Sequence, residues 1–311
     1  MYFEIQKKIE AYDTIIIHRH ENPDGDALGS QIGLAALLRE NYPEKKIYIV
    51  GDMSRRFAFM EGSEMALITD EVYKNALAIV LDTSASHLIS DKRYSLAKET
   101  VRIDHHLFCE KICDIELVDT SFESCAGLVA DFARVTGLRQ NTLSAKSLYT
   151  GMVTDSGRFR YDSTSAKTHA VASYLMQTPF STGEIYRNLY SDDFSFIRLR
   201  AQFVLKIQFT EKNVAYIYTT KEEVASYGVD TFSISRGMVN TMGEIRGVDI
   251  WTNFTETDAG ILCEIRSSKY NINPVAVKYG GGGHQKASGA TLSSREEAMA
   301  LLRDLENLMG E

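Results

Sequence analysis

The first half of the sequence alternates short apolar runs, rich in β-branched residues, with longer segments of helical periodicity. Four of these runs have the composition of buried strands: residues 14–17, 46–50, 77–81 and 100–103. Between the first two, residues 27–40 repeat apolar side chains on one helical face. Strands that alternate with helices predict an α/β fold, in which a parallel sheet is flanked on both sides by helices. Two more helices are expected, over residues 124–136 and 142–153.

The pattern of elements changes beyond about residue 190. We expect a connecting helix over 196–205, a helical stretch near 235–245, and strands near 204–209, 214–219, 250–255 and 260–266. The final helix begins at a capping box formed by Ser294 and Glu297 and carries one apolar stripe. These patterns predict a smaller α/β C-terminal domain with a mixed sheet. We divide the chain into a domain of residues 1–187, a helical linker of 188–200 and a second domain of 201–311.

Composition narrows the class of protein. With 311 residues, 44% hydrophobic and 24% charged, the chain is expected to fold into two globular domains. It has no apolar run of membrane-spanning length and no signal-peptide pattern at its start, so we expect a cytoplasmic protein without a membrane partner. A net charge of −8 argues against binding to long nucleic acid but leaves room for a short nucleotide at a local basic pocket. The four cysteines form no CxxC pair and are expected to be reduced thiols.

Acids and histidines follow several predicted strands at the point where each strand ends. His20, Asp24 and Asp26 lie in a turn-forming segment after the first strand, and Asp82 directly follows the third. Three consecutive residues, Asp104, His105 and His106, follow the fourth strand, and Asp155 ends a helical run. A single aspartate after a strand is usually only a turn or helix cap. Their joint occurrence is different, because parallel strands bring their carboxyl ends to the same edge of a sheet.

That many carboxylates within a few ångströms would repel one another strongly unless a cation lay between them. Mixed histidine and carboxylate ligands suit Mn²⁺, Fe²⁺ or Zn²⁺ better than Ca²⁺. The absence of cysteine from the set disfavours a structural zinc site. The sequence therefore predicts a divalent metal centre at this edge.

These residues resemble the motifs of the DHH phosphoesterases. The matching segments are His20-x-x-Pro23-Asp24-x-Asp26, Asp82, Asp104-His105-His106 and Thr154-Asp155. In the C-terminal half, Arg266-Ser267, Gly280 to His284 and Ala287-Ser288-Gly289 resemble the glycine-rich signature of the DHH-associated domain. The resemblance is greatest to the nanoRNase and pAp-phosphatase branch, which includes pApA-degrading phosphodiesterases of cyclic di-AMP turnover. It implies a metal-dependent phosphodiesterase that hydrolyses short linear oligonucleotides or pApA to nucleoside monophosphates, with pAp as a further candidate substrate.

The resemblance also implies roles for individual residues. Two Mn²⁺ ions are expected, with Mg²⁺ or another divalent metal as alternatives. His20, Asp24 and Asp82 would hold one ion, and Asp26, Asp82, His105 and Asp155 the other, so that Asp82 bridges the pair. Asp104 and His106 are the expected catalytic residues, with His106 facing the phosphate as a cation or as the acid for the leaving oxygen. Which histidine of the pair binds metal stays open.

Substrate contacts are expected mainly in the second domain. Residues 265–292 contain no acid but four basic residues, and glycines there allow backbone N–H groups to approach an anion. The candidate substrate-binding residues are Arg158, Arg266, Ser267, Gly281, Gly282, Gly283 and His284. The plainer interpretation is a flexible turn and a solvated strand. We expect the second domain to hold the end of the substrate distant from the bond that is cut.

Three other functions are alternatives. A manganese inorganic pyrophosphatase would share the N-terminal motifs, a single-strand exonuclease would need an added domain, and a non-catalytic nucleotide sensor would bind without turnover. The preferred substrate stays open among pApA, RNA of 2–5 nucleotides and pAp, as does a homodimer.

Overall fold

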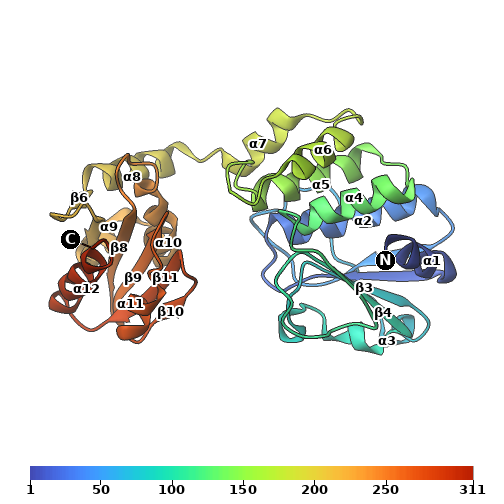
Figure 1. The fold of residues 1–311 in the computed structure, drawn as a ribbon, viewed down its shortest axis with the longest axis horizontal. Coiled ribbons are helices and arrows are strands. Elements are labelled where there is room, and N and C mark those ends of the chain that lie inside the picture. The colour runs from blue at the N-terminus through green and yellow to red at the C-terminus, as the bar shows by residue number, and fades with distance from the viewer. Residues whose placement is uncertain (311) are drawn as a thin grey trace. The chain divides into compact units, whose positions relative to one another are not determined.

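The computed structural model describes residues 1–310 and divides into two compact units (Figure 1). The first is Met1–Ser191, and the second begins at Asp192. Over the described residues, no helix has both the length and the apolar character needed to cross a bilayer. All four cysteines are free, as predicted.

The first unit is built on a five-stranded, fully parallel sheet in the order β2-β1-β3-β4-β5. Its strands are β1 (Thr14–His18), β2 (Lys46–Ile49), β3 (Leu77–Leu81), β4 (Glu99–Asp104) and β5 (Ile115–Val118). From β1 the chain moves outward to β2 and then returns to the other side of β1 as β3. The carboxyl ends of β1 and β3 therefore flank a switch point, the place where ligands bind in open parallel sheets. The parallel sheet is confirmed, and only β5 was not predicted, because it is an edge strand with half-buried residues.

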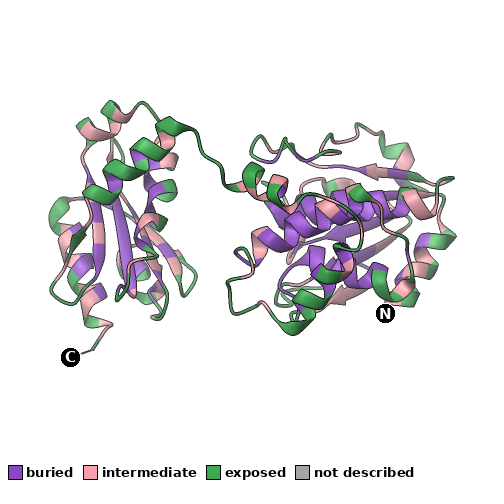
Figure 2. Ribbon diagram, turned by 90° about the horizontal axis from the view of Figure 1, so that it is seen from above, coloured by how far each residue is buried: buried purple, intermediate pink, exposed green. Residues whose placement is uncertain are grey.

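Helices flank both faces of this sheet, as predicted, but one face is covered by many more helices than the other. The larger layer contains α1 (Tyr2–Ala11), α2 (Gly25–Asn41), α4 (Cys125–Thr136), α5 (Thr142–Asp155), α6 (Ala166–Leu175) and α7 (Thr182–Tyr190). Ile15 and Ile17 pack into the large core beneath it, and Figure 2 shows these inner helices and strands as buried. Ile16 points the other way, toward a small cluster that includes Tyr73 of the short helix α3 (Asp70–Tyr73).

Helices α2 and α5 pack unusually closely through glycines spaced four residues apart on α2. These glycines are Gly25, Gly29 and Gly33, and all three face α5. A Cβ atom at Gly29 would lie 2.6 Å from the carbonyl oxygen of Ser147, and one at Gly33 would lie 2.5 Å from the Leu148 side chain. The spacing of one helical face thus brings two backbones together at a distance that only glycine permits.

The second unit contains a six-stranded sheet in the order β10-β11-β9-β8-β7-β6. Its strands are β6 (Gln208–Phe209), β7 (Ala215–Thr219), β8 (Ile250–Thr257), β9 (Gly260–Ser267), β10 (Gly282–Gly283) and β11 (Ala287–Leu292). The pair β7–β8 is parallel and the other pairs are antiparallel, so the predicted mixed sheet is confirmed. The helices are α8 (Phe194–Leu205), α9 (Lys221–Tyr227), α10 (Thr231–Val239), α11 (Asn273–Lys278) and α12 (Arg295–Asn307).

Local details of this unit differ from the sequence prediction. Helix α8 runs to Leu205, so the strand expected from 204 begins only at Gln208. Ser294 caps α12 as predicted, accepting a hydrogen bond from the Glu297 amide at 3.2 Å. The Glu297 carboxylate, however, accepts from the amide and hydroxyl of Ser293 instead of completing the capping box.

The close approach of α2 and α5 predicts the effect of a single methyl group. Gly29→Ala should destabilise the first unit by about 1–3 kcal/mol, because the added carbon meets rigid backbone. Gly183→Ala in α7 is the matched control, since a Cβ there meets its nearest atom only at 3.7 Å. Thermal unfolding of both variants checks the difference, and equal melting temperatures would contradict the packing argument.

Candidate metal centre

Histidines and carboxylates from five elements, three strands and two helices, converge at the carboxyl edge of the first sheet. His20 follows β1, Asp82 follows β3, and His105 and His106 follow β4. Helix α2 begins and helix α5 ends at the same place. Three groups of side chains there could each hold a metal ion: Asp82, His105 and His106; His20, Asp24 and Asp82; and Asp26, His105 and Asp155. The structure thus brings together all the predicted metal ligands.

Asp24 and Asp26 occupy the start of α2, which begins two residues before the predicted helix. Asp24 is the N-cap, and its Oδ1 accepts the amides of Asp26 and Ala27 at 2.9 and 3.0 Å. The prediction that Asp26 lies in a loop is wrong, because it stands in the first helical turn. Its buried carboxylate accepts the amides of Cys125 and Ala126 at 2.7 and 2.8 Å. Asp26 is therefore aimed by the N-terminus of α4, a part of the chain a hundred residues away.

Asp82 is the centre of the cluster. It is 2% exposed, and its Oδ1 has no hydrogen-bond partner among the described residues. The Nε2 atoms of His20 and His105 each lie 3.5 Å from its carboxylate, and Nδ1 of His106 lies 3.6 Å away. Its φ of 49° is left-handed, a strained conformation for a residue with a side chain. A buried carboxylate oxygen without a donor, surrounded by ligand atoms of the right chemistry, fits a bound divalent cation.

The ionisation of the cluster reflects its crowding. Burial lowers the pKa of His20, but neighbouring carboxylates raise it to about 11. Burial likewise opposes the charge of His105, whose pKa Asp82 and other carboxylates raise to about 10. Burial raises the pKa of Asp155 to about 6 and that of Asp26 well above its usual range. Burial also opposes the charge of Asp82, yet the two histidines hold its pKa below the ordinary value. In the metal-free chain, protons on the histidines supply the positive charge that metal ions would bring.

Asp104 turns away from the three candidate metal groups and orients His106 instead. Its Oδ1 accepts a hydrogen bond from Nδ1 of His106 at 2.7 Å, and its Oδ2 accepts from the buried guanidinium of Arg102. Hydrogen bonding to Asp104 is the main cause that raises the pKa of His106. Arg102 was not singled out from the sequence, although a charge between Val101 and Ile103 in a buried strand is a usable signal.

A second buried arginine supports the loop that carries His20, and sequence reasoning missed this network too. Arg19 is fully buried and donates to the His20 carbonyl at 2.9 Å and to Asp52 at 3.0 Å. The Asp52 carboxylate also accepts the amide of Asn22 at 3.0 Å. On the other side of the loop, the amide of Glu21 donates to the Leu88 carbonyl at 2.7 Å. These bonds hold the backbone of residues 19–22 against two other loops.

The predicted substrate residues of the second unit lie on β9 and on or next to β10, the two strands that flank β11. Arg266 on β9 is paired in register with Ala287 on β11, which also pairs with the glycine strand β10. The Ser267 hydroxyl accepts the amides of Lys269 and Tyr270, so it shapes the turn after β9. The His284 amide donates to the carbonyl of Ala287 at 2.7 Å.

Close packing accounts for two of the glycines. A Cβ atom at Gly281 would lie 2.0 Å from the Gly289 carbonyl oxygen, and one at Gly283, with φ of 133°, would lie 2.6 Å from the Ala287 carbonyl oxygen. A Cβ at Gly282 would meet open space. The glycines thus let the hairpin close tightly, a reason that sequence reasoning did not give.

The acid-free run is less basic in three dimensions than in sequence. Lys278 pairs with Asp304 of α12 at 2.7 Å, and Arg266 pairs with Glu264 of its own strand at 3.1 Å. Glu264 also pairs with Arg236 of α10 at 3.0 Å. Acids outside the run therefore balance part of its charge.

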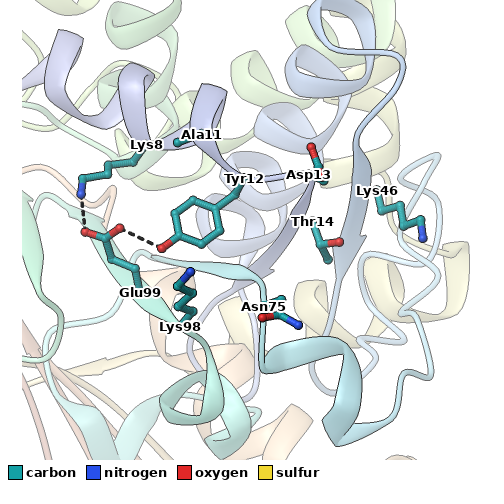
Figure 3. Close-up of a pocket in the computed structure, with 9 residues that line it drawn as sticks. All are labelled: Lys8, Ala11, Tyr12, Asp13, Thr14, Lys46, Asn75, Lys98 and Glu99. Atoms are coloured by element: carbon teal, nitrogen blue, oxygen red, sulfur yellow. Dashed lines mark hydrogen bonds and ion pairs between the residues drawn. The ribbon is translucent and has the colours of Figure 1, made fainter.

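A separate pocket of about 570 Å³ lies at the opposite edge of the first sheet (Figure 3). Thr14, Lys46 and Glu99, the first residues of β1, β2 and β4, are among its lining residues. Lys8 and the Tyr12 hydroxyl both point at Glu99, at 2.6 and 3.0 Å. This pocket lies where the strands begin and is distinct from the metal centre, where they end.

Comparison with known proteins agrees with this architecture. The DHH family N-terminal domain matches residues 14–153, and the DHHA1 domain matches residues 213–311. The chain therefore belongs to the DHH family, which confirms the family identified from its motifs.

Relatives extend the likeness over the whole chain. A bifunctional oligoribonuclease and PAP phosphatase NrnA of Bacillus subtilis is 37% identical, and the match covers 99% of this chain and 98% of that protein. A Streptococcus mutans protein described as a probable bifunctional oligoribonuclease and PAP phosphatase NrnA is 34% identical, and the match covers 98% of this chain and 98% of that protein. The crystal structure of an exopolyphosphatase-related protein from Bacteroides fragilis matches with a TM-score of 0.85 and 28% identity, covering 98% of this chain and 95% of that one.

The contact between Asp104 and His106 predicts a measurable change in ionisation. Asp104→Asn removes the charge that favours the imidazolium, so the pKa of His106 should fall by on the order of one pH unit. NMR titration of the metal-free protein measures it, with the signal assigned from His106→Gln. Asp70→Asn, a change at the exposed start of α3, is the control and should leave this pKa unchanged. An unaltered pKa in Asp104→Asn would contradict the assigned role.

Proposed function

We propose that this chain is a metal-dependent phosphodiesterase that cleaves short linear oligoribonucleotides, including pApA, to nucleoside monophosphates and also converts pAp to AMP. The observation that carries the proposal is the convergence of histidines and carboxylates around the buried Asp82 carboxylate, whose Oδ1 accepts no hydrogen bond among the described residues. Membership of the DHH family and the names of the relatives support the choice of substrate.

Two divalent ions, with Mn²⁺ as the proposed species, would supply Lewis acidity to the phosphoryl oxygens and lower the pKa of the attacking water. His20, Asp24 and Asp82 would hold one ion. The other would be held by Asp26, Asp82, His105 and Asp155. Asp82 would then serve both ions, in keeping with its central place among the three candidate groups.

The overall reaction is hydrolysis: water adds to phosphorus, and the ester bond to the leaving oxygen breaks. Hydrogen bonding to Asp104 raises the pKa of His106 and so favours its protonated form. It can stabilise negative charge on the phosphoryl group or give its proton to the leaving oxygen. Asp104 holds the ring in place, and Arg102 balances the buried charge of Asp104.

The deciding experiment is product analysis after incubation with Mn²⁺. Purified protein is given pApA, RNA of 2–5 nucleotides, pAp and pyrophosphate in parallel, and the products are separated by chromatography. We expect nucleoside monophosphates from the first three substrates. Turnover of pyrophosphate alone would favour the pyrophosphatase alternative, and binding without turnover would favour a nucleotide sensor.

Asp82→Asn should abolish turnover while the protein stays folded. Asparagine tolerates the left-handed φ of this position, so the variant removes charge with little backbone penalty. Asp119→Asn is a matched control, because Asp119 follows β5 as Asp82 follows β3 but pairs with Lys167 at 3.6 Å. We expect kcat of Asp82→Asn to fall to less than about a tenth of the wild-type value, given the size of two-metal contributions. A larger residual rate would contradict the bridging role.

We further propose that Arg266 and His284 contribute to substrate binding and take no part in the chemistry. Arg266→Ala and His284→Ala should each raise KM for a dinucleotide and so lower kcat/KM. The loss should correspond to about 1.5–3 kcal/mol of activation free energy, as expected for a lost charge-assisted hydrogen bond. Bis-p-nitrophenyl phosphate, which has no second nucleotide, should be affected much less. Lys278→Ala, at the end of α11, is the control for the loss of a paired positive charge within the same acid-free run, since Lys278 pairs with Asp304 as Arg266 pairs with Glu264. It should leave kcat/KM for the dinucleotide unchanged. Equal loss on both substrates, with unchanged melting, would place Arg266 and His284 in the chemistry.

A further inference from the structure

Three consecutive residues after α5 adopt the left-handed backbone conformation. The φ angles of Gly157, Arg158 and Phe159 are 57°, 67° and 60°. One such residue with a side chain is uncommon and two in succession are rarer, because the Cβ atom crowds the backbone. Strain of this kind persists only where the surroundings enforce it, and it gathers at functional sites.

The surroundings of this turn do enforce it. The amide of Arg158 donates to the carbonyl of Val153 at 2.8 Å, and the amide of Phe159 donates to the hydroxyl of Ser156 at 2.9 Å. The Phe159 ring packs at 5.7 Å from the rings of both Tyr149 and His169. Anchored by its neighbour, Arg158 is left exposed, three residues after the candidate metal ligand Asp155.

The exposed Arg158 lies over an aromatic ring. Its guanidinium carbon is 4.7 Å from the ring centroid of Tyr190, the last residue of α7. Tyr190 is itself 38% exposed and has the ring of Tyr186 at 5.9 Å. An exposed arginine stacked on a tyrosine, three residues along the chain from the candidate metal ligand Asp155, matches the composition of surfaces that bind unpaired nucleobases.

A further positive charge stands near this pair. Arg56 belongs to the segment after β2, where its guanidinium carbon lies 5.3 Å from the centroid of the Phe57 ring. Burial raises the pKa of Tyr190, and the charges of Arg158 and, more weakly, of Arg56 oppose that rise. The same segment lies against α7, since Phe59 and Met60 share a small pocket with Ile185 and Asn188. No salt bridge of Arg56 or Arg158 with a carboxylate occurs among the described residues, so both are available to an anion.

We propose that Tyr190 and Arg158 form a stacking platform for a nucleobase next to the phosphate that is cleaved, with Arg56 positioned for a neighbouring phosphate. The inference rests on the proposed phosphodiesterase function and deepens it, since it assigns a base-binding subsite to the first unit. The ligand is an unpaired base, held by its π-face, so the subsite tolerates all four bases.

The test compares substrates that differ only in the base. Kinetics are measured for wild type, Tyr190→Leu and Tyr190→Phe on a dinucleotide, on the same dinucleotide lacking the base on one side, and on bis-p-nitrophenyl phosphate. We expect Tyr190→Leu to lower kcat/KM for the complete dinucleotide about tenfold or more, with Tyr190→Phe close to wild type. The abasic dinucleotide is made in two forms, one lacking each base. The form that lacks the stacked base should give the same kcat/KM with all three proteins, and so should bis-p-nitrophenyl phosphate.

A second variant separates binding from structure. Arg158→Asn keeps a residue that tolerates the left-handed turn, so its melting temperature should equal or exceed that of wild type while kcat/KM for the dinucleotide falls. Arg139→Asn is the control, an exposed arginine before α5 that should change neither quantity. Quenching of a 2-aminopurine dinucleotide reports stacking without turnover and should weaken in Tyr190→Leu.

The outcomes separate the inference from the function beneath it. If wild type cleaves dinucleotides and Tyr190→Leu cleaves complete and abasic substrates in the same ratio as wild type, the stacking platform is refuted and the phosphodiesterase stands. If wild type cleaves no phosphodiester with any divalent metal, the proposed function fails, whatever the fluorescence shows. If Arg158→Asn loses stability and activity together, the turn is structural and the platform is again refuted.

Discussion

The metal centre depends on the close packing of α2 against α5. Glycines on one face of α2 let the two backbones approach, and the two helices meet the sheet edge with opposite ends. The start of α2 supplies Asp24 and Asp26, and the end of α5 supplies Asp155. A wider separation of the helices would move Asp155 away from the other carboxylates. Backbone contact, which flexible side chains cannot absorb, therefore sets the distance between groups that must share a cation.

Burying the carboxylates of this centre is electrostatically unfavourable. Asp26 and Asp82 are almost completely buried. Among the described residues, His20 and His105 supply the positive charge that holds the pKa of Asp82 low, whereas burial raises the pKa of Asp26 well above its usual range. The supporting shell is therefore built from strong, fixed donors. Backbone amides at the start of α4 hold Asp26, and the buried Arg102 holds Asp104. Such fixed donors keep ligand geometry in place whether protons or metal ions supply the charge.

The sequence predicted the parts of this centre that depend on local pattern. Strand ends are visible where an apolar run stops at an acid or histidine, and parallel topology then implies one common edge. Contacts between distant segments were out of reach, because nothing local to Asp26 indicates that the amide of Cys125 will bind it. The same reason explains why the pairing of Lys278 with Asp304 was missed, and why a run free of acids was interpreted as more basic than it is. The early start of α2 was missed because Gly25 and Asp26 resemble a turn.

The shortness of the edge strands affects whether the sheet of the second unit can pair with strands of other protein molecules. Both outermost strands of this sheet, β6 and β10, are two residues long. A sheet edge normally exposes a row of unpaired amides and carbonyls on which another strand can assemble, and proteins often protect such edges by shortening them. Here the glycine hairpin leaves almost no template at one border, and Gln208 with Phe209 leaves little at the other. The compact turn that brings Gly281 against β11 thereby also protects the sheet from edge-to-edge aggregation.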